Sequence, residues 1–262
     1  RMLMKNIKLI ACDLDGTLLK SDKSISYHTI NILEKCRARG IAVALATARS
    51  ERGAKSVVSP FVPDFIISSG GSKISHCGKT IYVSQIPPEI VRDIISMCRN
   101  FMDGKGELTI ETDSGHYWDY KIKPQNTTVE SNSFYTDFKD FNEPAYKVTA
   151  ELDRDDYCFE IIKRYPQLTF SGYSGEMWKR FAMLDADKSH AIERVCKYLG
   201  TAPSTVVAFG DDFNDIDMLR LCGAGVAMEN ATNEAKEAAD FITASNDSDG
   251  VAKFLEENVL NI

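Results

Sequence analysis

Short, largely apolar runs alternate with amphipathic segments along the N-terminal part of the chain. The runs have the length of buried strands, and the segments between them repeat apolar side chains every three or four residues, as a helix packed on one face does. Ser26 stands at a helix N-cap position, and Gly40 stands where that helix should end. This order is typical of a parallel sheet with helices on its faces. The predicted strands are 7–12, 41–46 and 65–68, and the predicted helices are 26–39 and 50–58.

The same alternation returns after Asp187. A helix that ends before Gly200 is followed by two short apolar runs, and a helical segment follows each run. The two parts of the pattern predict one doubly wound sheet, built from both ends of the chain. The predicted elements are helix 188–199, strand 206–209, a helix ending near 221, strand 225–228, and helices 233–239 and 247–258.

The chain between these two parts has a different character. Residues 73–77 and 80–84 predict a hairpin, and Pro87-Pro88 opens a helix that runs to about Phe101. The stretch that follows is rich in aromatic residues and mixes helix and strand signals. We therefore predict an α/β protein with a doubly wound parallel-sheet domain from residues 1–84 and 184–262, and an inserted α+β domain at 85–183.

The composition is typical of a globular protein, and the net charge limits the classes of partner it is expected to bind. The chain has 262 residues, of which 44% are hydrophobic and 26% are charged, as in ordinary globular domains. It has 31 Lys and Arg residues against 38 Asp and Glu residues, a formal net charge of −7. Because an acidic protein repels phosphate backbones and anionic lipids, we expect neither a nucleic acid nor a membrane as partner.

The cysteines and the N-terminus indicate a compartment. The seven cysteines are widely spaced and include no Cys-x-x-Cys pair, which is typical of free thiols in a reducing compartment. The sequence shows no signal peptide, and no apolar stretch approaches the roughly 18 residues that span a bilayer. We expect a cytoplasmic protein that is a monomer or a weak homodimer.

Candidate chemistry begins at Asp13 and Asp15, directly after the first predicted strand. Residues two apart in an extended backbone point to the same side, and Gly16 then permits a tight turn. Two carboxylates this close repel each other unless a proton or a cation intervenes. Mg2+ prefers oxygen ligands and commonly binds one or two carboxylates together with a phosphate. The pair therefore predicts a Mg2+ site at the end of this strand.

Further polar residues follow neighbouring strands. Thr47 follows the second predicted strand, with Arg49 two residues on, and Asp211 follows the strand at 206–209. Lys188 stands at a helix start, where the helix dipole does not favour a cation. Because ligand sites in open α/β sheets lie outside the carboxyl ends of the strands, we expect these side chains to converge. Arg49 stays open between a phosphate contact and a structural ion pair.

Four motifs taken in order resemble those of the haloacid dehalogenase (HAD) superfamily of phosphatases: Asp13-Leu14-Asp15-Gly16-Thr17, Ala46-Thr47-Ala48-Arg49, Lys188, and the segment from Gly210 to Met218. In that last segment we expect Asp212 to be a helix cap. The C-terminal part, which includes Asp249-Gly250-Val251-Ala252, resembles the Cof-type branch. That branch has an α/β cap between its second and third motifs, where residues 85–183 lie. Ala48 stands where Gly is usual, and it can still offer its N–H.

The resemblance implies a Rossmann-like core with an inserted cap, and a role for each matching residue. Asp13 would attack phosphorus and form an aspartyl-phosphate, and Asp15 would protonate the leaving oxygen and then activate water. Asp13, the Asp15 carbonyl and Asp211 would hold Mg2+, with Asp215 supporting them. The phosphoryl oxygens would be held by Thr47, Lys188, Asn214 and the backbone amides of Leu14 and Ala48.

The function implied is Mg2+-dependent hydrolysis of small phosphorylated metabolites, with hexose and other sugar phosphates first. Two alternatives stay open. A phosphomutase would use the same aspartyl-phosphate but return the phosphoryl group to a sugar. A non-catalytic sugar-phosphate sensor would use the fold for binding alone. The presence of Asp13, Asp15, Lys188 and Asp211 argues against a sensor, because binding alone does not need a nucleophile beside an acid.

Overall fold

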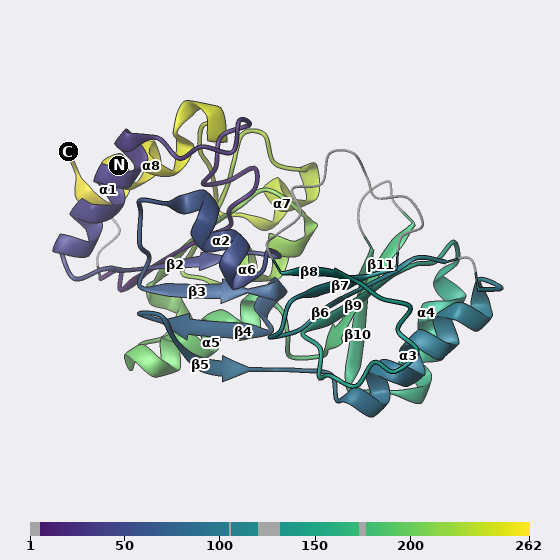
Figure 1. Cartoon of the computed structure of the whole chain (residues 1–262). Coiled ribbons are helices and arrows are strands. Elements are labelled where there is room, and N and C mark those ends of the chain that lie inside the picture. Colours follow the sequence, from purple (N-terminus) through teal and green to yellow (C-terminus); the bar gives the residue numbers. More distant parts are fainter. Residues whose placement is uncertain (1–5, 105, 120–131, 173–176) are drawn as a thin grey trace. The chain divides into compact units, whose positions relative to one another are not determined.

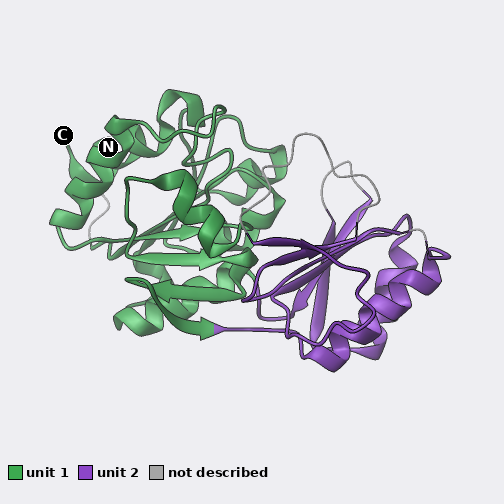
Figure 2. Ribbon diagram, viewed as in Figure 1, with its two compact units in different colours: residues 1–82, 187–262 green, residues 83–186 purple. Residues whose placement is uncertain are grey.

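The computed structural model describes residues 6–104, 106–119, 132–172 and 177–262. The chain divides into two compact units, which Figure 2 shows in different colours. Unit 1 comprises residues 1–82 and 187–262, and unit 2 comprises residues 83–186. Both ends of the chain therefore build unit 1, and unit 2 is a single insertion. Within the described residues, no helix has the length and apolar character needed to cross a membrane.

Unit 1 is built on an eight-stranded sheet. Its strands are β1 (Leu9–Cys12), β2 (Ala42–Ala46), β3 (Phe65–Ser68), β4 (Lys73–His76), β5 (Lys79–Val83), β12 (Val206–Gly210), β13 (Ala224–Ala227) and β14 (Phe241–Ile242). Their order is β14-β13-β12-β1-β2-β3-β4-β5 (Figure 1). Neighbours from β14 to β3 are parallel, and β4 runs antiparallel to β3. The central strand β1 pairs with β12 on one side and β2 on the other.

Helices cover both faces of this sheet. They are α1 (Tyr27–Ala38), α2 (Glu51–Val58), α5 (Lys188–Leu199), α6 (Ile216–Leu221), α7 (Asn233–Ala238) and α8 (Gly250–Leu255). The connections β1–α1–β2 and β12–α6–β13 run in opposite directions across the sheet, so right-handed crossovers put α1 and α6 on opposite faces. α8 packs against α1, as Figure 1 shows, while α5 and α7 pack against α6. The predicted doubly wound α/β fold is confirmed.

The apolar runs form the core of unit 1. Every residue of β1 and β12 is buried, because both faces of a parallel sheet are covered. The N-cap of α1 is Ser26, whose hydroxyl accepts a hydrogen bond from the amide of Thr29 at 3.0 Å. The N-cap of α5 is Asp187 and its C-cap is Gly200, which has a left-handed φ of 66°. The local signals and the packing therefore agree on where these elements begin and end.

The C-terminal segment differs from the prediction. The single helix expected over 247–258 is a 3-10 turn η4 (Asn246–Ser248), then α8, then a π-helical turn η5 (Glu256–Leu260). Asp249 has a left-handed φ of 56°, which breaks the helix before α8 begins. The strand β14 was not predicted, because two residues are too few to produce a strand pattern.

Unit 2 has its own sheet and core. Its strands are β6 (Leu108–Glu111), β7 (His116–Trp118), β8 (Ser133–Tyr135), β9 (Lys147–Glu151), β10 (Leu168–Gly172) and β11 (Trp178–Met183), and its helices are α3 (Pro88–Phe101) and α4 (Asp155–Arg164). The sheet order is β10-β11-β9-β6-β7-β8, with only the β7–β8 pair parallel among the described pairs. α3 and α4 pack against each other and against the sheet. Ile94, Val148 and Phe181 are buried in the core of this unit.

Candidate active site

The candidate site lies in unit 1, where three neighbouring strands end. Asp13 directly follows β1, Thr47 directly follows β2, and Asp211 directly follows β12. Because β1 lies between β2 and β12, the three strand ends are adjacent at one edge of the sheet. Ligand sites in open α/β sheets form at such an edge.

Lys188 is the centre of a buried cluster of charges. Its ammonium donates hydrogen bonds to Oδ1 of Asp13 and to Oδ1 of Asp215, both at 2.6 Å. The Lys188 side chain is only 5% exposed, so it is not a surface lysine. It is the first residue of α5, and the N-cap side chain of Asp187 fixes that helix start by accepting a hydrogen bond from the amide of His190.

Asp211 joins this cluster. One carboxylate oxygen from each of Asp13, Asp211 and Asp215 lies within 4.8 Å of the others. The hydroxyl of Thr17 donates to Oδ1 of Asp211 at 2.7 Å. Gly16 has a φ of +84°, and a Cβ at this position would lie 2.2 Å from Oδ2 of Asp211. Only glycine therefore allows the loop after β1 to approach the carboxylate this closely.

Asp215 links Lys188 to the backbone of the loop after β12. Its Oδ1 accepts from Lys188, and its Oδ2 accepts from the backbone amides of Asp211 at 2.9 Å and Asp212 at 3.1 Å. Both carboxylate oxygens of Asp215 thus accept hydrogen bonds from the protein. Asp212 accepts a hydrogen bond from the amide of Phe213 and caps the 3-10 turn η3 (Phe213–Asp215), which confirms its predicted role as a cap.

The cluster has more negative than positive charge, and its pKa values reflect this. Burial raises the pKa of Asp13, and the neighbouring carboxylates of Asp215 and Asp211 raise it further, while Lys188 lowers it. Burial, followed by the charges of Asp215 and Asp212, raises the pKa of Asp211 to about 6. Burial lowers the pKa of Lys188, but Asp13 and Asp215 raise it by more, so this ammonium stays charged.

The donor set of this cluster suits a hard divalent cation. Asp13 and Asp211 offer carboxylate oxygens, the ligands that Mg2+ prefers, while Asp215 already accepts three hydrogen bonds from the protein. A cation would also offset the excess negative charge that raises the pKa values of Asp13 and Asp211. The residues present therefore fit the predicted metal.

Asp15 lies between two cations. Arg49 donates from Nε to Oδ2 at 2.6 Å and from Nη2 to Oδ1 at 2.8 Å, and Lys23 donates from Nζ to Oδ1 at 2.8 Å. The hydrogen bond from Arg49 is the main cause that lowers the pKa of Asp15 to about 2; Lys23 adds to it, and burial opposes it. Of the two roles left open for Arg49, the structure shows an ion pair, with Asp15.

The remaining predicted residues lie close to the ends of the same strands β1, β2 and β12. Thr47 is buried, and its hydroxyl accepts a hydrogen bond from the amide of Arg49 at 3.1 Å. Leu14 is buried, and Ala48 is half-buried. Asn214 is exposed in η3, and no hydrogen bond joins it to the cluster in the described part of the chain.

Two residues with contacts in the site were not singled out from the sequence. Thr17 was part of a quoted motif but received no role, and only its contact with Asp211 reveals one. Lys23 lies in a loop outside the motifs, and its eight-residue separation from Asp15 gives no periodic signal.

The Rossmann-like sheet, the inserted α+β unit and the carboxylates after β1 and β12 define a class of α/β enzymes with an acidic site at the sheet edge. The family model of haloacid dehalogenase-like hydrolases matches residues 10–255. The chain therefore belongs to this family and is an enzyme, a hydrolase of the HAD type.

The alignments with named relatives cover almost the whole chain. Phosphatase YwpJ of Bacillus subtilis is 28% identical over 290 aligned residues, which cover 95% of this chain and 99% of YwpJ. The 5-amino-6-(5-phospho-D-ribitylamino)uracil phosphatase YcsE of the same organism is 28% identical, with 97% of each chain covered. A solved haloacid dehalogenase-like hydrolase from B. subtilis has a TM-score of 0.81 at 26% identity and covers 95% of this chain and 99% of that one.

A sugar phosphatase of HAD subclass IIB also has this fold. Its structure matches with a TM-score of 0.77 at 23% identity, and the match covers 95% of this chain and 98% of that chain. At this identity the likeness is one of fold alone.

Proposed function

We propose that this protein is a Mg2+-dependent phosphatase that hydrolyses small phosphomonoesters through an aspartyl-phosphate at Asp13, with sugar phosphates as the first substrates to test. One observation carries the proposal: Asp13 is buried at the end of β1 with its Oδ1 2.6 Å from the ammonium of Lys188. The relative YcsE is named for a phosphorylated ribityl compound, and the subclass IIB neighbour is named a sugar phosphatase.

Attack by Asp13 on a phosphate dianion needs positive charge nearby. At about 4 Å and an effective dielectric constant near 20, the repulsion between two unit negative charges is about 4 kcal/mol. Lys188 offsets part of this repulsion. Asp13, the Asp15 carbonyl and Asp211 would hold Mg2+, which when bound supplies further positive charge at the phosphoryl oxygens. Asp215 would support these ligands.

The phosphoryl oxygens need donors that are fixed before the reaction. We assign this role to the hydroxyl of Thr47, the ammonium of Lys188, the side-chain amide of Asn214 and the backbone amides of Leu14 and Ala48. Asn214 is exposed in η3, so it would reach the substrate from the solvent side of the cluster.

The chemistry has two steps. A carboxylate oxygen of Asp13 forms a bond to phosphorus while the ester P–O bond breaks, and the leaving oxygen takes a proton from Asp15. A water molecule then gives a proton to Asp15 and attacks phosphorus, which breaks the bond to Asp13 and releases inorganic phosphate. Asp15 must gain a proton before the first step. The approach of a dianion favours this, because its charge offsets those of Arg49 and Lys23.

We assign residues 85–183 to a cap domain that selects the substrate, and residues 1–84 and 184–262 to the catalytic domain. We also propose that the protein acts in the cytoplasm. All seven cysteines lie in the described part of the chain and each is a free thiol, which suits a reducing compartment.

The test is phosphate release from a panel of phosphorylated metabolites, with and without Mg2+, for the wild type and Asp13→Asn. We expect Mg2+-dependent release that the variant loses by at least about a thousandfold, since the nucleophile itself is gone. Asp217→Asn, which removes one exposed carboxylate from α6, is the charge-matched control and should keep wild-type activity.

Other outcomes would point to the alternative functions. An isomerised sugar phosphate without free phosphate would indicate a phosphomutase. Binding of a sugar phosphate without any turnover, unaffected by Asp13→Asn, would indicate a sensor.

A further inference from the structure

Lys23 reaches the proposed acid–base residue from a loop outside the family motifs. Its ammonium donates to Oδ1 of Asp15 at 2.8 Å, on the oxygen that also accepts from Nη2 of Arg49. The Lys23 side chain is 57% exposed. An ion pair this exposed contributes little by itself, because water screens it and the long side chain loses entropy. Its geometry must therefore come from the loop that presents it.

Hydrogen bonds within the loop at residues 20–24 stabilise the conformation around Lys23. The amide of Lys20 donates to the carbonyl of Ser24, and the amide of Lys23 donates to the carbonyl of Lys20, both at 2.9 Å. The carboxylate of Asp22 accepts from the amide and from the hydroxyl of Ser24. Lys23 itself has a left-handed φ of 67°, which directs its side chain away from the path of a regular strand or helix.

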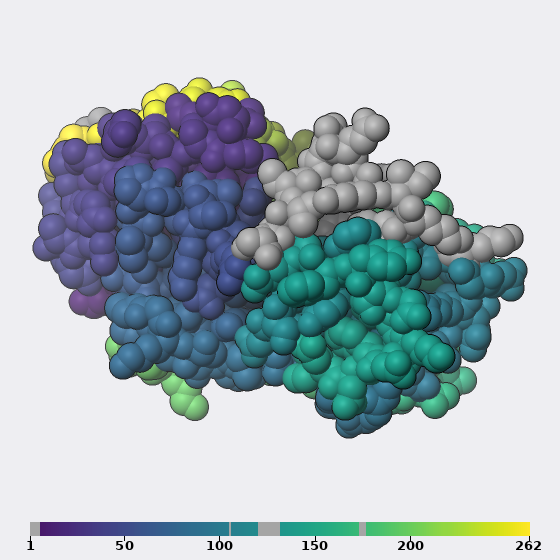
Figure 3. Space-filling view, viewed as in Figure 1, coloured from purple at the N-terminus to yellow at the C-terminus, as the bar shows by residue number. Residues whose placement is uncertain are grey.

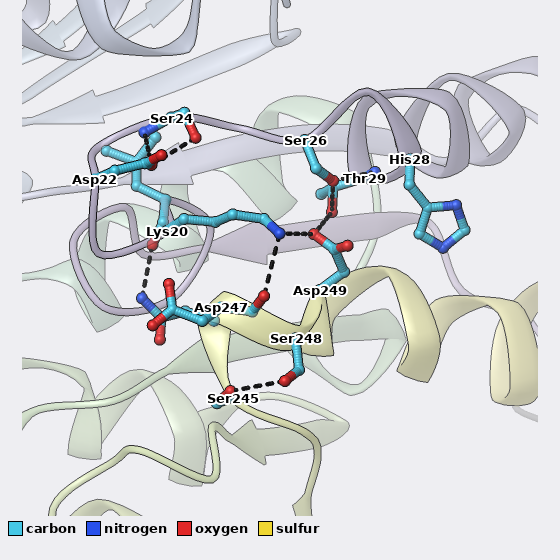
Figure 4. Close-up of polar contacts among 12 residues, drawn as sticks. Lys20, Asp22, Ser24, Ser26, His28, Thr29, Ser245, Asp247, Ser248 and Asp249 are labelled. Atoms are coloured by element: carbon cyan, nitrogen blue, oxygen red, sulfur yellow. Dashed lines mark hydrogen bonds and ion pairs between the residues drawn. The ribbon is translucent and has the colours of Figure 1, made fainter.

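Asp247 ties this loop to the C-terminal part of the chain. Its two carboxylate oxygens accept from the amide of Ser21 at 2.8 Å and from the hydroxyl of Ser21 at 2.7 Å, although the two residues are 226 positions apart. The ammonium of Lys20 donates to the carbonyl of Asp247 at 3.1 Å and pairs with Asp249 at 3.3 Å. Figure 4 shows Lys20 extended between these two partners.

Two asparagines hold the rest of the loop. The amide group of Asn230 donates to the carbonyl of Gly16 at 2.7 Å, and that of Asn246 donates to the carbonyl of Leu19 at 2.9 Å. In Figure 3 the purple N-terminal and yellow C-terminal surfaces of unit 1 accordingly lie side by side. The loop is therefore fixed at several points between Gly16 and Ser24, and Lys23 lies inside the fixed part.

We infer that Lys23 is a positioning residue for Asp15, and that Asp247 holds the loop that presents Lys23. The inference rests on the proposed function, in which Asp15 transfers the proton. Arg49 donates to both oxygens of Asp15, and Lys23 adds a contact from a separate segment. Together they hold the carboxyl group in one place. Loss of Lys23 should therefore slow the chemical step more than it weakens substrate binding.

The experiment compares steady-state kinetics of Lys23→Met, Lys23→Arg, Asp247→Asn and the double variant Lys23→Met/Asp247→Asn. For Lys23→Met we expect kcat to fall about tenfold with KM within about twofold, a part of the 100- to 10,000-fold that general acid–base catalysis supplies. Lys23→Arg should recover most of kcat, because its guanidinium keeps the charge and the donors. Lys35→Met, an exposed lysine on α1, is the matched control and should behave as wild type.

The contact between Asp247 and the loop at residues 20–24 can be tested separately. Asp247→Asn keeps the size of the side chain but removes its charge and one acceptor oxygen. We therefore expect a fall in kcat of about threefold and faster amide hydrogen exchange in residues 20–24. In the double variant kcat should equal that of Lys23→Met, because Asp247 acts through Lys23.

Several outcomes would overturn the inference. Wild-type kcat in Lys23→Met would do so, as would a raised KM at unchanged kcat, which would put Lys23 on the substrate. If the losses in kcat multiplied in the double variant, Asp247 would not act through Lys23. If amide hydrogen exchange were unchanged in Asp247→Asn, Asp247 would not hold the loop. An active wild type with any of these results contradicts this inference alone. A wild type that releases no phosphate from any ester contradicts the proposed function, and the inference fails with it.

Discussion

Lys188 is buried between two carboxylates, and stability alone does not account for this arrangement. Taking an ammonium out of water costs several kcal/mol, and apolar side chains of similar volume often stabilise a core equally well. Here one ammonium faces Asp13 and Asp215 at 2.6 Å, with Asp211 close by. Three carboxylates against one cation leave unbalanced charge in a buried place. Such an arrangement is expected where a cation and a phosphate bind.

The pKa of Asp211 predicts how Mg2+ binding depends on pH. Burial raises this pKa from the ordinary value of 3.8 to about 6. In the metal-free protein the contribution of Asp211 to stability is therefore complete below 3.8 and is lost as the pH rises through about 6. Mg2+ needs the ionised carboxylate, so the rise in Tm that Mg2+ causes should be larger at about pH 7.5 than at about pH 5.

Differential scanning fluorimetry of the metal-free protein, with and without Mg2+, measures this difference. Asp211→Asn should reduce the Mg2+ effect at both pH values, because it removes one of the carboxylates proposed to bind the metal. Equal stabilisation at the two pH values in the wild type would mean that Asp211 does not control metal binding.

Some residues of the site can be predicted from the sequence, and others cannot. Asp13, Thr47 and Asp211 could be predicted because each directly follows a buried strand, and Lys188 because it opens a helix. Lys23 could not, because its place depends on contacts between segments more than 200 positions apart, such as the hydrogen bond from Ser21 to Asp247. Local patterns locate strand ends, but they do not reveal which distant loops fold against them.

At the scale of elements, the start of α5 fixes the place of Lys188. Asp187 accepts from the amide of His190 at 2.9 Å, and Ser189 donates to the same carboxylate at 2.6 Å. The backbone of Asp187 is also in close contact with Gly71, where a Cβ would lie 2.2 Å from the carbonyl oxygen of Asp187. The first turn of the helix is thus held from both sides, and the lysine side chain leaves it toward β1.

Loss of this cap should act on stability and on rate together. Asp187→Ala should lower the free energy of unfolding by about 1 kcal/mol, the usual effect of losing an N-cap. It should also lower kcat for phosphate release, by about three- to tenfold, because a frayed first turn no longer fixes the Lys188 ammonium. Asp187→Asn is the matched variant: Asn caps helices as well as Asp, so both values should stay near wild type.

Urea denaturation and steady-state kinetics measure the two effects. A destabilised Asp187→Ala enzyme with wild-type kcat would show that the contacts of Lys188 with Asp13 and Asp215 suffice to place it without the cap.

The elements themselves could be predicted where local signals and packing agree. α1 and α5 have N-cap side chains, helical spacing and a residue that ends the helix, and the structure places them within one residue of the prediction. The C-terminal segment could not be predicted, because Asp249 takes a left-handed conformation in contact with Lys20 and Thr29 of distant segments. The periodicity continues through this break, so the sequence alone indicates one helix.

At the scale of the whole molecule, each unit buries a separate hydrophobic core. The core of unit 1 includes Phe209 of β12, and that of unit 2 includes Phe181 of β11; both side chains are fully buried. The proposed metal ligands all belong to unit 1. A unit with its own core can unfold in its own cooperative transition. The two units can therefore have different free energies of unfolding.

Calorimetry should therefore show two unfolding transitions, and Mg2+ should raise only the one that belongs to unit 1. Phe181→Ala removes a buried ring and should destabilise unit 2 by about 3–5 kcal/mol, which lowers its transition and leaves the Mg2+-sensitive one in place. Phe209→Ala is the matched change in unit 1 and should lower the Mg2+-sensitive transition instead. If either substitution moved a single transition as a whole, the two cores would be one cooperative unit, and the insertion would contribute directly to the stability of the catalytic core.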